Sequence, residues 1–378
     1  MIKKKKICLV VSSEMTIKTF LLDHLKLLCI EYDVFIVAGT NCQYLHNDYK
    51  LDISVIKIPI NRNINIGRDF LSLIRLFLVF KKIKFDLIHS ITPKAGLLSM
   101  IAGYISRIPV RIHIFTGQIW AQKKNIIRMM LQYIDRLIVF FSTNILADSE
   151  SQMEFIIKEK IVAPNKISVL ANGSISGVNI QRFAHNDSAR KIVRQKLNIS
   201  NKDIVFLFIG RLKYDKGILD LCTAFKKNFS GRHNAHLLIV GPDEEKIVDV
   251  INKLDIKKEK LHLIPYAEKP EKYLVSADIL CLPSYREGFG NVIIEAASCR
   301  LPSIGSRIYG ITDAILEYET GLLHAPGDIS ALGSLMEKLY LNEELRNSMG
   351  QAAYERAKSS FSSNKVTAAW LDYYATLI

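Results

Sequence analysis

Residues 204–227 read IVFLFIGRLKYDKGILDLCTAFKK, and this stretch contains the pattern that decides the fold. Residues 204–209 are all apolar, so a strand formed by them has no polar face to turn toward water. Such a strand is typical of the centre of a parallel sheet that helices cover on both faces. Residues 217–227 follow with the pattern of a helix. Strand, loop and helix in this order predict a βαβ unit.

The same alternation runs through the rest of the chain. Further strands are predicted at residues 6–11, 34–38, 54–58, 87–90, 110–115, 145–147, 236–240, 261–264, 279–282 and 302–305. Further helices are predicted at residues 17–30, 69–84, 94–106, 125–141, 244–253, 291–299 and 331–342. The predicted fold class is therefore α/β, with two doubly wound parallel-sheet domains in tandem.

The chain has 378 residues, which is too long for one ordinary hydrophobic core. The glycine- and asparagine-rich stretch 172–201 is the expected seam. We therefore predict a first domain at 1–178, a second at 179–360, and a final helical segment at 361–378. That segment carries Trp370, Tyr373 and Tyr374 at helical spacing, and we expect it to pack back toward the first domain.

Composition excludes several classes of protein. Hydrophobic residues make up 49% and charged residues 23%, which is ordinary for a folded protein and unlike a disordered or fibrous one. No apolar stretch is long enough to span a bilayer, and the apolar run after the basic start is too short for a secretory signal. The six cysteines form no C-x-x-C pair and no zinc-ligand pattern, so we expect a cytoplasmic protein with reduced thiols.

The net charge of +14 is unevenly distributed. Residues 1–180 hold 24 basic and 13 acidic side chains, whereas residues 181–378 hold 27 and 24. A basic first half is compatible with nucleic acid, an anionic membrane or phosphate-bearing substrates as partners.

A first candidate site follows the strand quoted above. After Gly210 the loop presents Arg211 and then Lys216, next to the start of a helix. Two cations beside a helix N-terminus can bind an anion. Neither a P-loop nor a G-x-G-x-x-G fingerprint is present, and two solvated surface cations are the competing interpretation.

A second candidate site lies in SYREGFGNVIIEAASC, residues 284–299. Glu287 precedes Gly288, Phe289 and Gly290, and Glu295 lies about one turn inside the helix that follows. The glycines permit close approach of a ligand to the backbone, and the first amides of the helix favour a negative ligand. Either glutamate alone is explained by a surface helix, but the combination is not.

These motifs together resemble the retaining glycosyltransferases of family 4. The resemblance rests on G-R-L-x-x-x-K-G from Gly210, on E-x₇-E between Glu287 and Glu295, on the Asn172-Gly173 to Phe183 segment, and on E-T-G-L-L and P-G-D at 319–323 and 326–328. Residues 174–177 are an insertion relative to that family, and Asn179 replaces its usual Asp. The family has the GT-B fold, in which two Rossmann-like domains face a cleft that binds a nucleotide-sugar.

The resemblance implies a role for each matching residue. Arg211 and Lys216 would neutralise the leaving diphosphate, Glu287 would hold the donor sugar, and these three are the predicted catalytic residues. Glu295 would hold the ribose hydroxyls and Tyr266 would lie near the base. The predicted donor-binding set is Gly210, Arg211, Lys216, Tyr266, Glu287, Gly288, Phe289, Gly290, Asn291 and Glu295. No D-x-D triplet occurs, so neither a metal nor another cofactor is expected.

The first domain departs from the family pattern in two places. The glycine-rich turn after the first strand is replaced by Ser12 and Ser13, and the usual His-Gly pair by Thr116-Gly117. Strand alternation places His113 on the opposite face from Thr116, so a core role is the simpler interpretation for this histidine. The possible contacts from the first domain are Ser12, Ser13, Lys94, His113, Thr116, Gly117 and Gln118, with Lys94 as a candidate for an acceptor phosphate.

The implied activity is transfer, with retention, of a sugar from a nucleotide-diphosphate-sugar to a glycan acceptor. A UDP-sugar is favoured and a GDP-sugar is possible. The acceptor would be linked to a lipid diphosphate, in capsule, O-antigen or exopolysaccharide synthesis at the inner face of the cell membrane. An anionic membrane surface is then a further partner, and basic amphipathic segments at 69–84 and 120–136 could contact it. For 69–84, a crossover helix packed on the sheet is the simpler interpretation.

Three alternatives compete with this interpretation. A sugar-nucleotide epimerase would share the fold, but the R-L-x-x-x-K-G and E-G-F-G motifs argue against it. A nucleic-acid-binding protein would fit the charge, but no motif of that class is present, so no nucleic-acid partner is predicted. A membrane-associated scaffold without activity is disfavoured by the presence of both cations and both glutamates.

Overall fold

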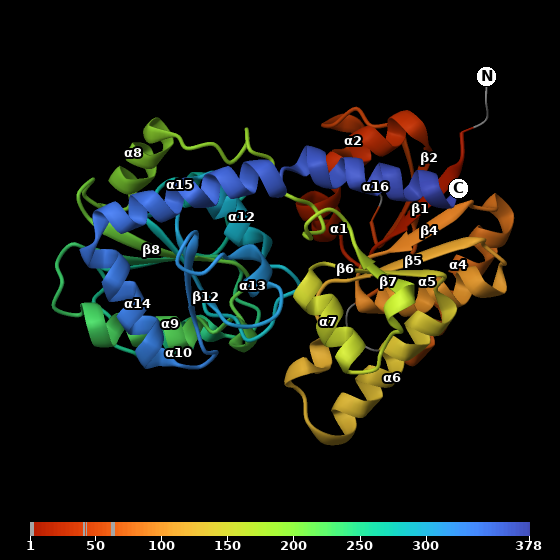
Figure 1. Ribbon diagram of the computed structural model, residues 1–378. Coiled ribbons are helices and arrows are strands. Elements are labelled where there is room, and N and C mark those ends of the chain that lie inside the picture. The colour runs from red at the N-terminus through yellow and green to blue at the C-terminus, as the bar shows by residue number, and fades with distance from the viewer. Residues whose placement is uncertain (1–3, 41, 43, 62–64) are drawn as a thin grey trace. The chain divides into compact units, whose positions relative to one another are not determined.

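The computed structural model describes residues 4–40, 42, 44–61 and 65–378. The chain forms two compact units (Figure 1). Unit 1 comprises Met1–Ser176 together with Ser363–Ile378, and unit 2 comprises Gly177–Ser362. The last helix therefore belongs to unit 1.

Unit 1 is built on a seven-stranded parallel sheet in the order β3-β2-β1-β4-β5-β6-β7. Its strands are β1 (Lys6–Val10), β2 (Asp33–Ala38), β3 (Ile53–Lys57), β4 (Leu87–Ser90), β5 (Val110–Phe115), β6 (Asn144–Ala147) and β7 (Ile167–Val169). The first six confirm the predicted strands to within one residue. The sequence did not predict β7, which has only three residues.

Helices cover both faces of this sheet (Figure 1). On one face lie α4 (Ile66–Ile83), α5 (Pro93–Ile105) and α6 (Asn125–Phe141), with α5 between the other two. On the other face lie α2 (Leu22–Glu31) and α16 (Ser363–Leu377). The shorter elements are α1 (Glu14–Thr16), a π-helical turn η1 (Ile17–Leu21), α3 (Tyr44–Asn47), η2 (Ile119–Gln122), α7 (Glu150–Lys158) and η3 (Pro164–Lys166).

Aromatic stacking attaches α16 to unit 1. The ring of Trp370 stacks on His24 and on His89, with centroid distances of 4.4 and 4.6 Å. The hydroxyl of Tyr374 lies 2.6 Å from Nδ1 of His89. Burial lowers the pKa of His24 to about 4 and that of His89 well below its ordinary value, so both rings are neutral at neutral pH.

Unit 2 is built on a six-stranded parallel sheet in the order β10-β9-β8-β11-β12-β13. Its strands are β8 (Ile204–Ile209), β9 (Ala235–Val240), β10 (Leu261–Ile264), β11 (Ile279–Leu282), β12 (Ser303–Ser306) and β13 (Gly321–His324). Its helices are α8 (Asp187–Lys196), α9 (Ile218–Phe229), α10 (Ile247–Asn252), α11 (Glu271–Leu274), α12 (Asn291–Ser298), α13 (Ile311–Ala314), α14 (Ile329–Leu341) and α15 (Glu343–Ser360), with a 3-10 turn η4 (Tyr214–Lys216).

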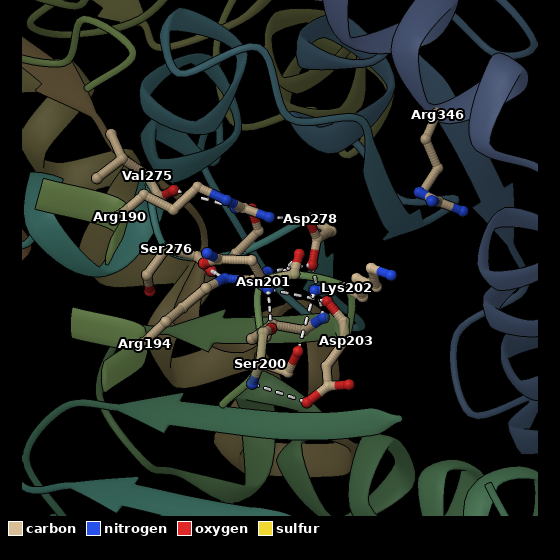
Figure 2. Close-up of polar contacts among 12 residues, drawn as sticks. Arg190, Arg194, Ser200, Asn201, Lys202, Asp203, Val275, Ser276, Asp278 and Arg346 are labelled. Atoms are coloured by element: carbon tan, nitrogen blue, oxygen red, sulfur yellow. Dashed lines mark hydrogen bonds and ion pairs between the residues drawn. The ribbon is translucent and has the colours of Figure 1, made fainter. Parts of the chain in front are cut away.

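Two arginines of α8 fasten that helix to the amino ends of β8 and β11 (Figure 2). Arg190 and Arg194 each donate to a different oxygen of Asp278 at 2.6 Å. The backbone amide of Val205 donates to the same carboxylate at 2.7 Å. Arg194 is 1% exposed and also donates to the carbonyl oxygens of Ser276 and Ser200. This network lies at the sheet edge where strands begin, so its role is structural.

Each sheet has one point where the strand order reverses. In unit 1 this switch point lies between β1 and β4, and in unit 2 it lies between β8 and β11. Doubly wound sheets bind ligands outside the carboxyl ends of their strands at such points. Among the helices of the described residues, none is both long enough and apolar enough to cross a membrane.

Candidate active site

The loops after β8 and β11 meet at the switch point of unit 2. Gly217 directly precedes α9 and has a φ of 65°, and a Cβ there would lie 2.0 Å from the carbonyl oxygen of Pro283. Only glycine therefore lets the loop after β8 pass this close to the loop after β11. The close passage brings the residues on either side of Gly217 beside those that follow Pro283.

The two motifs predicted from the sequence come together as an ion pair. Nζ of Lys216 lies 2.6 Å from Oε1 of Glu287, and the two side chains are only 14% and 15% exposed. The hydroxyl of Ser284 donates to the same carboxylate oxygen at 2.9 Å. A cation and a carboxylate are thus held side by side at the carboxyl edge of the sheet.

A second ion pair, which the sequence did not predict, joins the same two loops. Nη2 of Arg286 lies 2.8 Å from Oδ2 of Asp215, and the amide of Tyr285 donates to the backbone carbonyl of Asp215. Burial opposes ionisation of Asp215, but the hydrogen bond and charge of Arg286, with the charge of Lys216, lower its pKa. The only signal in the sequence was that Asp215 and Arg286 directly precede the two predicted residues.

Arg211 contacts the loop after β9, not the loop after β11 that holds Glu287. Its side chain is 40% exposed, and Nη1 lies 3.2 Å from a carboxylate oxygen of Glu244. The next cation, Lys213, lies 3.1 Å from Glu245. Arg211 is therefore partly exposed at the same edge and is held by Glu244. The sequence did not indicate this ion pair.

The glycines of the second motif have the conformations that their position requires. Gly290 precedes α12 with a φ of 81°, and a Cβ on Gly310 would lie 2.4 Å from the carbonyl oxygen of Gly288. Phe289 is buried against Phe361, with ring centroids 5.1 Å apart, and Asn291 is the first residue of α12. The loop after β11 is therefore closely packed.

Glu295 belongs to a different charged cluster from Glu287. Burial raises the pKa of Glu295 to about 7, although the charge of Arg182 opposes this shift, and the nearby Glu271 adds to it. Arg182 forms its own ion pair with Glu271 at 3.1 Å. Within the described residues, no ion pair joins Glu295 to Lys216 or Arg211. Tyr266 follows β10 and is 61% exposed.

In unit 1 the predicted serines lie at that unit's own switch point. The hydroxyl of Thr92, after β4, donates to that of Ser12, after β1, at 3.0 Å. Ser13 caps α1 by accepting from the amide of Met15. Thr92 has a φ of 103°, which is strained for a residue with a Cβ. Strain of this kind concentrates at functional sites, and no pattern in the sequence indicated it.

Of the other residues predicted for unit 1, Lys94 and Gln118 are paired and Gly117 is buried. Lys94 forms a salt bridge to Asp69 at 2.7 Å, and Gln118 accepts a hydrogen bond from Gln152 at 3.0 Å. Thr116 is partly exposed, and Gly117 follows it with a φ of 107°. Lys94 can therefore reach an acceptor only by leaving a carboxylate of its own unit.

His113 lies inside the core of unit 1. Its ring is fully buried, and Nδ1 lies 2.8 Å from the hydroxyl of Ser90. A Cβ added to Gly96 of α5 would lie 2.5 Å from the ring, so the helix passes directly over this histidine. Burial lowers the pKa of His113 to about 3. The ring is thus neutral and covered by α5.

The described residues contain no group of three or more His, Cys, Asp or Glu side chains placed to hold a metal ion.

Two family models match the chain, one in each unit. The model described as "Glycosyltransferase Family 4" matches residues 21–174, and the model described as "Glycosyl transferases group 1" matches residues 189–356. The first match falls entirely within unit 1 and the second entirely within unit 2.

Individual proteins are similar over most of the chain. The capsular polysaccharide biosynthesis glycosyltransferase CapM of Staphylococcus aureus is 32% identical over 88% of this chain and 86% of its own length. An Escherichia coli UDP-Gal:alpha-D-GlcNAc-diphosphoundecaprenol alpha-1,3-galactosyltransferase is 26% identical over 84% of this chain and 82% of its own.

A solved structure with the same fold is that of HepE from Anabaena in complex with UDP-glucose. It has a TM-score of 0.81 and 18% identity, and the match covers 98% of this chain and 99% of that one. The fold is the GT-B fold that the sequence predicted. With a relative above 30% identity over most of its length and both units matched by family models, the chain belongs to the group 1, family 4 glycosyltransferases.

Proposed function

We propose that this enzyme transfers a sugar, with retention of anomeric configuration, from a nucleoside-diphosphate-sugar to a glycan acceptor carried on a lipid diphosphate. The observation that carries the proposal is the Lys216–Glu287 ion pair at the switch point of unit 2, 2.6 Å long and largely shielded from water. A cation and a hydrogen-bond acceptor at this edge suit a ligand with a diphosphate on one side and sugar hydroxyls on the other.

In this proposal the donor replaces the internal ion pair. The leaving diphosphate binds Lys216 and Arg211, and the hydroxyls of the donor sugar donate hydrogen bonds to Glu287. Negative charge builds up on the diphosphate as the glycosidic bond breaks, so cations fixed beforehand stabilise the transition state more than the ground state. Gly288 and Gly290 let the sugar and the β-phosphate approach the backbone, and Glu295 accepts from the ribose.

The relatives favour the donor and acceptor classes. The Escherichia coli relative is named for a UDP-sugar donor and a diphosphoundecaprenol acceptor. A further relative from Campylobacter jejuni, 24% identical over 79% of this chain and 79% of its own length, is named for a diphospho-undecaprenol acceptor. By analogy we take a UDP-sugar as the first donor to test, with a GDP-sugar second, and capsule or related polysaccharide synthesis as the setting. The reaction would take place at the cytoplasmic face of the membrane, without a metal.

A donor screen followed by product analysis tests the proposal. Thermal shift with UDP, GDP and ADP identifies the base, because a nucleotide at a hundred times its Kd adds about 2.7 kcal/mol of stability. Transfer from the matching sugar to a lipid-diphosphate glycan, with and without a chelator, is then followed by NMR of the anomeric signals. An inverted product, or activity lost with the chelator and restored by a metal, would contradict the mechanism.

The epimerase alternative is distinguished in the same screen. An epimerase converts the donor without any acceptor, whereas a transferase leaves it largely unchanged. Conversion of the donor sugar in the absence of acceptor would replace the proposed function.

A further inference from the structure

Two ion pairs, one residue apart, join the loop after β8 to the loop after β11. Asp215 pairs with Arg286 at 2.8 Å. Lys216, the next residue of the first loop, pairs with Glu287, the next residue of the second, at 2.6 Å. The first loop therefore has the order acid then cation, and the second loop has the order cation then acid. Each charge faces its opposite in the other loop and also follows or precedes its opposite along the chain.

This alternation of charge fixes how the two loops pair. If one loop shifted by one residue, Lys216 would face Arg286 and two cations would meet. A shift in the other direction would bring Asp215 against Glu287 and two acids would meet. The side chains of all four residues are at most 20% exposed, so water screens such repulsion only partly. Of the three arrangements, only the observed one gives each cation an acid.

Asp215 is held to the loop after β11 by its backbone as well as by its side chain. Nη2 of Arg286 donates to its Oδ2, and the amide of Tyr285 donates to its carbonyl oxygen at 2.9 Å. Its other carboxylate oxygen, Oδ1, is buried and has no hydrogen-bond partner among the residues that the structure describes. Burial acts to raise the pKa of Asp215, but the hydrogen bond and charge of Arg286 lower it overall, so the carboxyl is ionised at neutral pH.

Tyr285 gives the loop after β11 a second attachment. Its hydroxyl donates at 2.6 Å to Oδ2 of Asp220, which lies in the first turn of α9. This hydrogen bond, together with burial, raises the pKa of Tyr285 to about 12, so the hydroxyl stays protonated and continues to donate. A Cβ on Gly327 would lie 3.1 Å from the same hydroxyl, so the loop after β13 packs against it. The two residues directly before Glu287 are thus both tied to α9 or to the turn that precedes it.

The two ion pairs differ in what a bound donor does to them. In the proposed function the diphosphate binds Lys216 and the sugar binds Glu287, so the attraction between these two side chains is lost when the donor enters. The pair of Asp215 and Arg286 has no part in that exchange and continues to link the two loops. Displacing a catalytic group by about 1 Å can cost about 10²-fold in rate, so a link that survives donor binding matters for turnover.

We infer that Asp215 and Arg286 are positioning residues of this site. Their ion pair keeps Lys216 and Glu287 at a fixed separation while the donor lies between them. The inference rests on the proposed function, because it concerns how the site holds its donor. The link between the loops, however, exists in the ligand-free chain and can be measured without any donor.

Direct contact of Arg286 with the diphosphate is the competing role for this residue. Its guanidinium directly precedes Glu287 and could bind a phosphate if Asp215 released it. The two roles predict opposite effects of Asp215→Asn. An Arg286 that binds phosphate would be freed by this change and would hold the nucleotide more tightly. A positioning pair would be broken by the same change, which would leave Lys216 displaced and turnover reduced.

Steady-state transfer by the full chain, with the donor identified by thermal shift, tests the inference. Asp215→Asn and Arg286→Gln should each lower kcat about tenfold, with a much smaller change in KM, because fixed charge at Lys216 stabilises the transition state more than the bound donor. Combining the two changes should cost no more than either alone, since each breaks the same link. Arg286→Lys should recover most of the activity, because one nitrogen, Nη2, makes the contact with Asp215.

A milder variant and a matched control accompany these changes. Tyr285→Phe removes the hydrogen bond to Asp220 without removing a charge, and it should lower kcat by a smaller factor with the fold intact. Arg232→Gln makes the same change as Arg286→Gln elsewhere in unit 2. Arg232 lies between α9 and β9, at the edge where strands begin, and pairs with Glu337 at 3.2 Å. It should keep the kcat of the wild type.

Amide hydrogen exchange of the ligand-free chain measures the link itself. Peptides that cover residues 284–290 should exchange several-fold faster in Asp215→Asn than in the wild type, because the loop opens more often once the ion pair is lost. Exchange in Arg232→Gln should match the wild type in these peptides. Circular dichroism and a cooperative urea transition show that each variant is folded.

The outcomes separate this inference from the proposed function. Unchanged kcat in Asp215→Asn or Arg286→Gln, an equal loss in Arg232→Gln, or tighter nucleotide binding by Asp215→Asn would overturn the inference and leave the proposed function standing. If the wild-type chain transferred no sugar but exchange in residues 284–290 still rose in Asp215→Asn, the link between the loops would stand and the proposed function would be wrong.

Discussion

Nζ of Lys216 lies 2.6 Å from Oε1 of Glu287, so the two residues predicted to contact the donor neutralise each other before it binds. Each side chain is about 15% exposed, and the hydroxyl of Ser284 holds the carboxylate in place. This arrangement gives a largely buried cation and a largely buried acid a partner each, and in the proposed function a diphosphate and a sugar replace those partners. It also means that removing either partner affects the other.

Replacing the predicted phosphate-binding cations should reduce turnover without unfolding the chain. Lys216→Ala and Arg211→Ala should each lower kcat/KM about 10²-fold or more, because each removes a fixed positive charge from the leaving diphosphate. The measurement is steady-state transfer with the donor identified by thermal shift, alongside the melting temperature of each variant.

Lys213→Ala is the matched control for these two changes. Lys213 lies between them in the sequence, in the same loop, but its ammonium pairs with Glu245 at 3.1 Å. It should keep turnover within a few-fold of wild type. Full turnover in both Lys216→Ala and Arg211→Ala would show that the diphosphate lies elsewhere.

The parts of the fold that the sequence predicted are those with a local signal. β8 and β11 are continuously apolar, and both were predicted with the bounds that they have. β7 and β13 were missed because three or four residues of mixed or glycine-led sequence carry no such pattern. Short edge strands are fixed by their neighbour in the sheet rather than by their own composition.

In the candidate site, too, the residues that were predicted are those with a local signal in the sequence. Lys216 and Glu287 were predicted together because each belongs to a motif at the end of a strand, and neighbouring strands bring those ends side by side. The partners Glu244 and Arg286 were not predicted, since an ion pair between distant loops leaves no local spacing. Strain at Thr92 is likewise a property of the folded backbone.

If Glu295 holds the ribose as proposed, nucleotide binding should weaken as the pH falls through about 7, because the ionised carboxylate accepts two hydroxyls better than the neutral acid and burial raises the pKa of Glu295 to about 7. Affinity should fall up to about tenfold per pH unit below that value. Glu295→Gln should bind the nucleotide more weakly at high pH and with a flatter pH profile, as measured by titration calorimetry. Glu337→Gln, at an exposed acid on α14, should retain the wild-type profile.

The same carboxyl affects stability with the opposite sign. The pKa of Glu295 is raised from 4.5 to about 7 in the folded chain, so the folded state holds a proton that the unfolded state has lost between these values. The contribution of Glu295 to the stability of the ligand-free chain should therefore decline as the pH rises through this window. Glu295→Gln should raise the urea midpoint at about pH 8 more than at about pH 5. An equal effect at both values would contradict the raised pKa.

Gly96→Ala should destabilise unit 1 by about 1–3 kcal/mol, since the new methyl group would lie 2.5 Å from the fully buried ring of His113. Combining it with His113→Ala should cost less than the two changes added together, because the second change removes the obstruction. Gly67→Ala in α4, where a Cβ meets only Asn65 at 3.9 Å, should be neutral or stabilising. Urea unfolding measures all four variants, and simple additivity would contradict the packing described here.

The Arg194–Asp278 pair should be essential for the stability of unit 2 (Figure 2). Asp278→Leu leaves the guanidinium of Arg194, which is 1% exposed, without a counter-charge, and should cost about 3–5 kcal/mol. Glu337→Leu removes the acid from an ion pair with Arg232 whose partners are 45% and 41% exposed, and should cost at most about 1 kcal/mol. The measurement is the urea midpoint of each variant. Equal costs would mean that the carbonyl oxygens of Ser276 and Ser200, which Arg194 also contacts, suffice to hold its charge in the core.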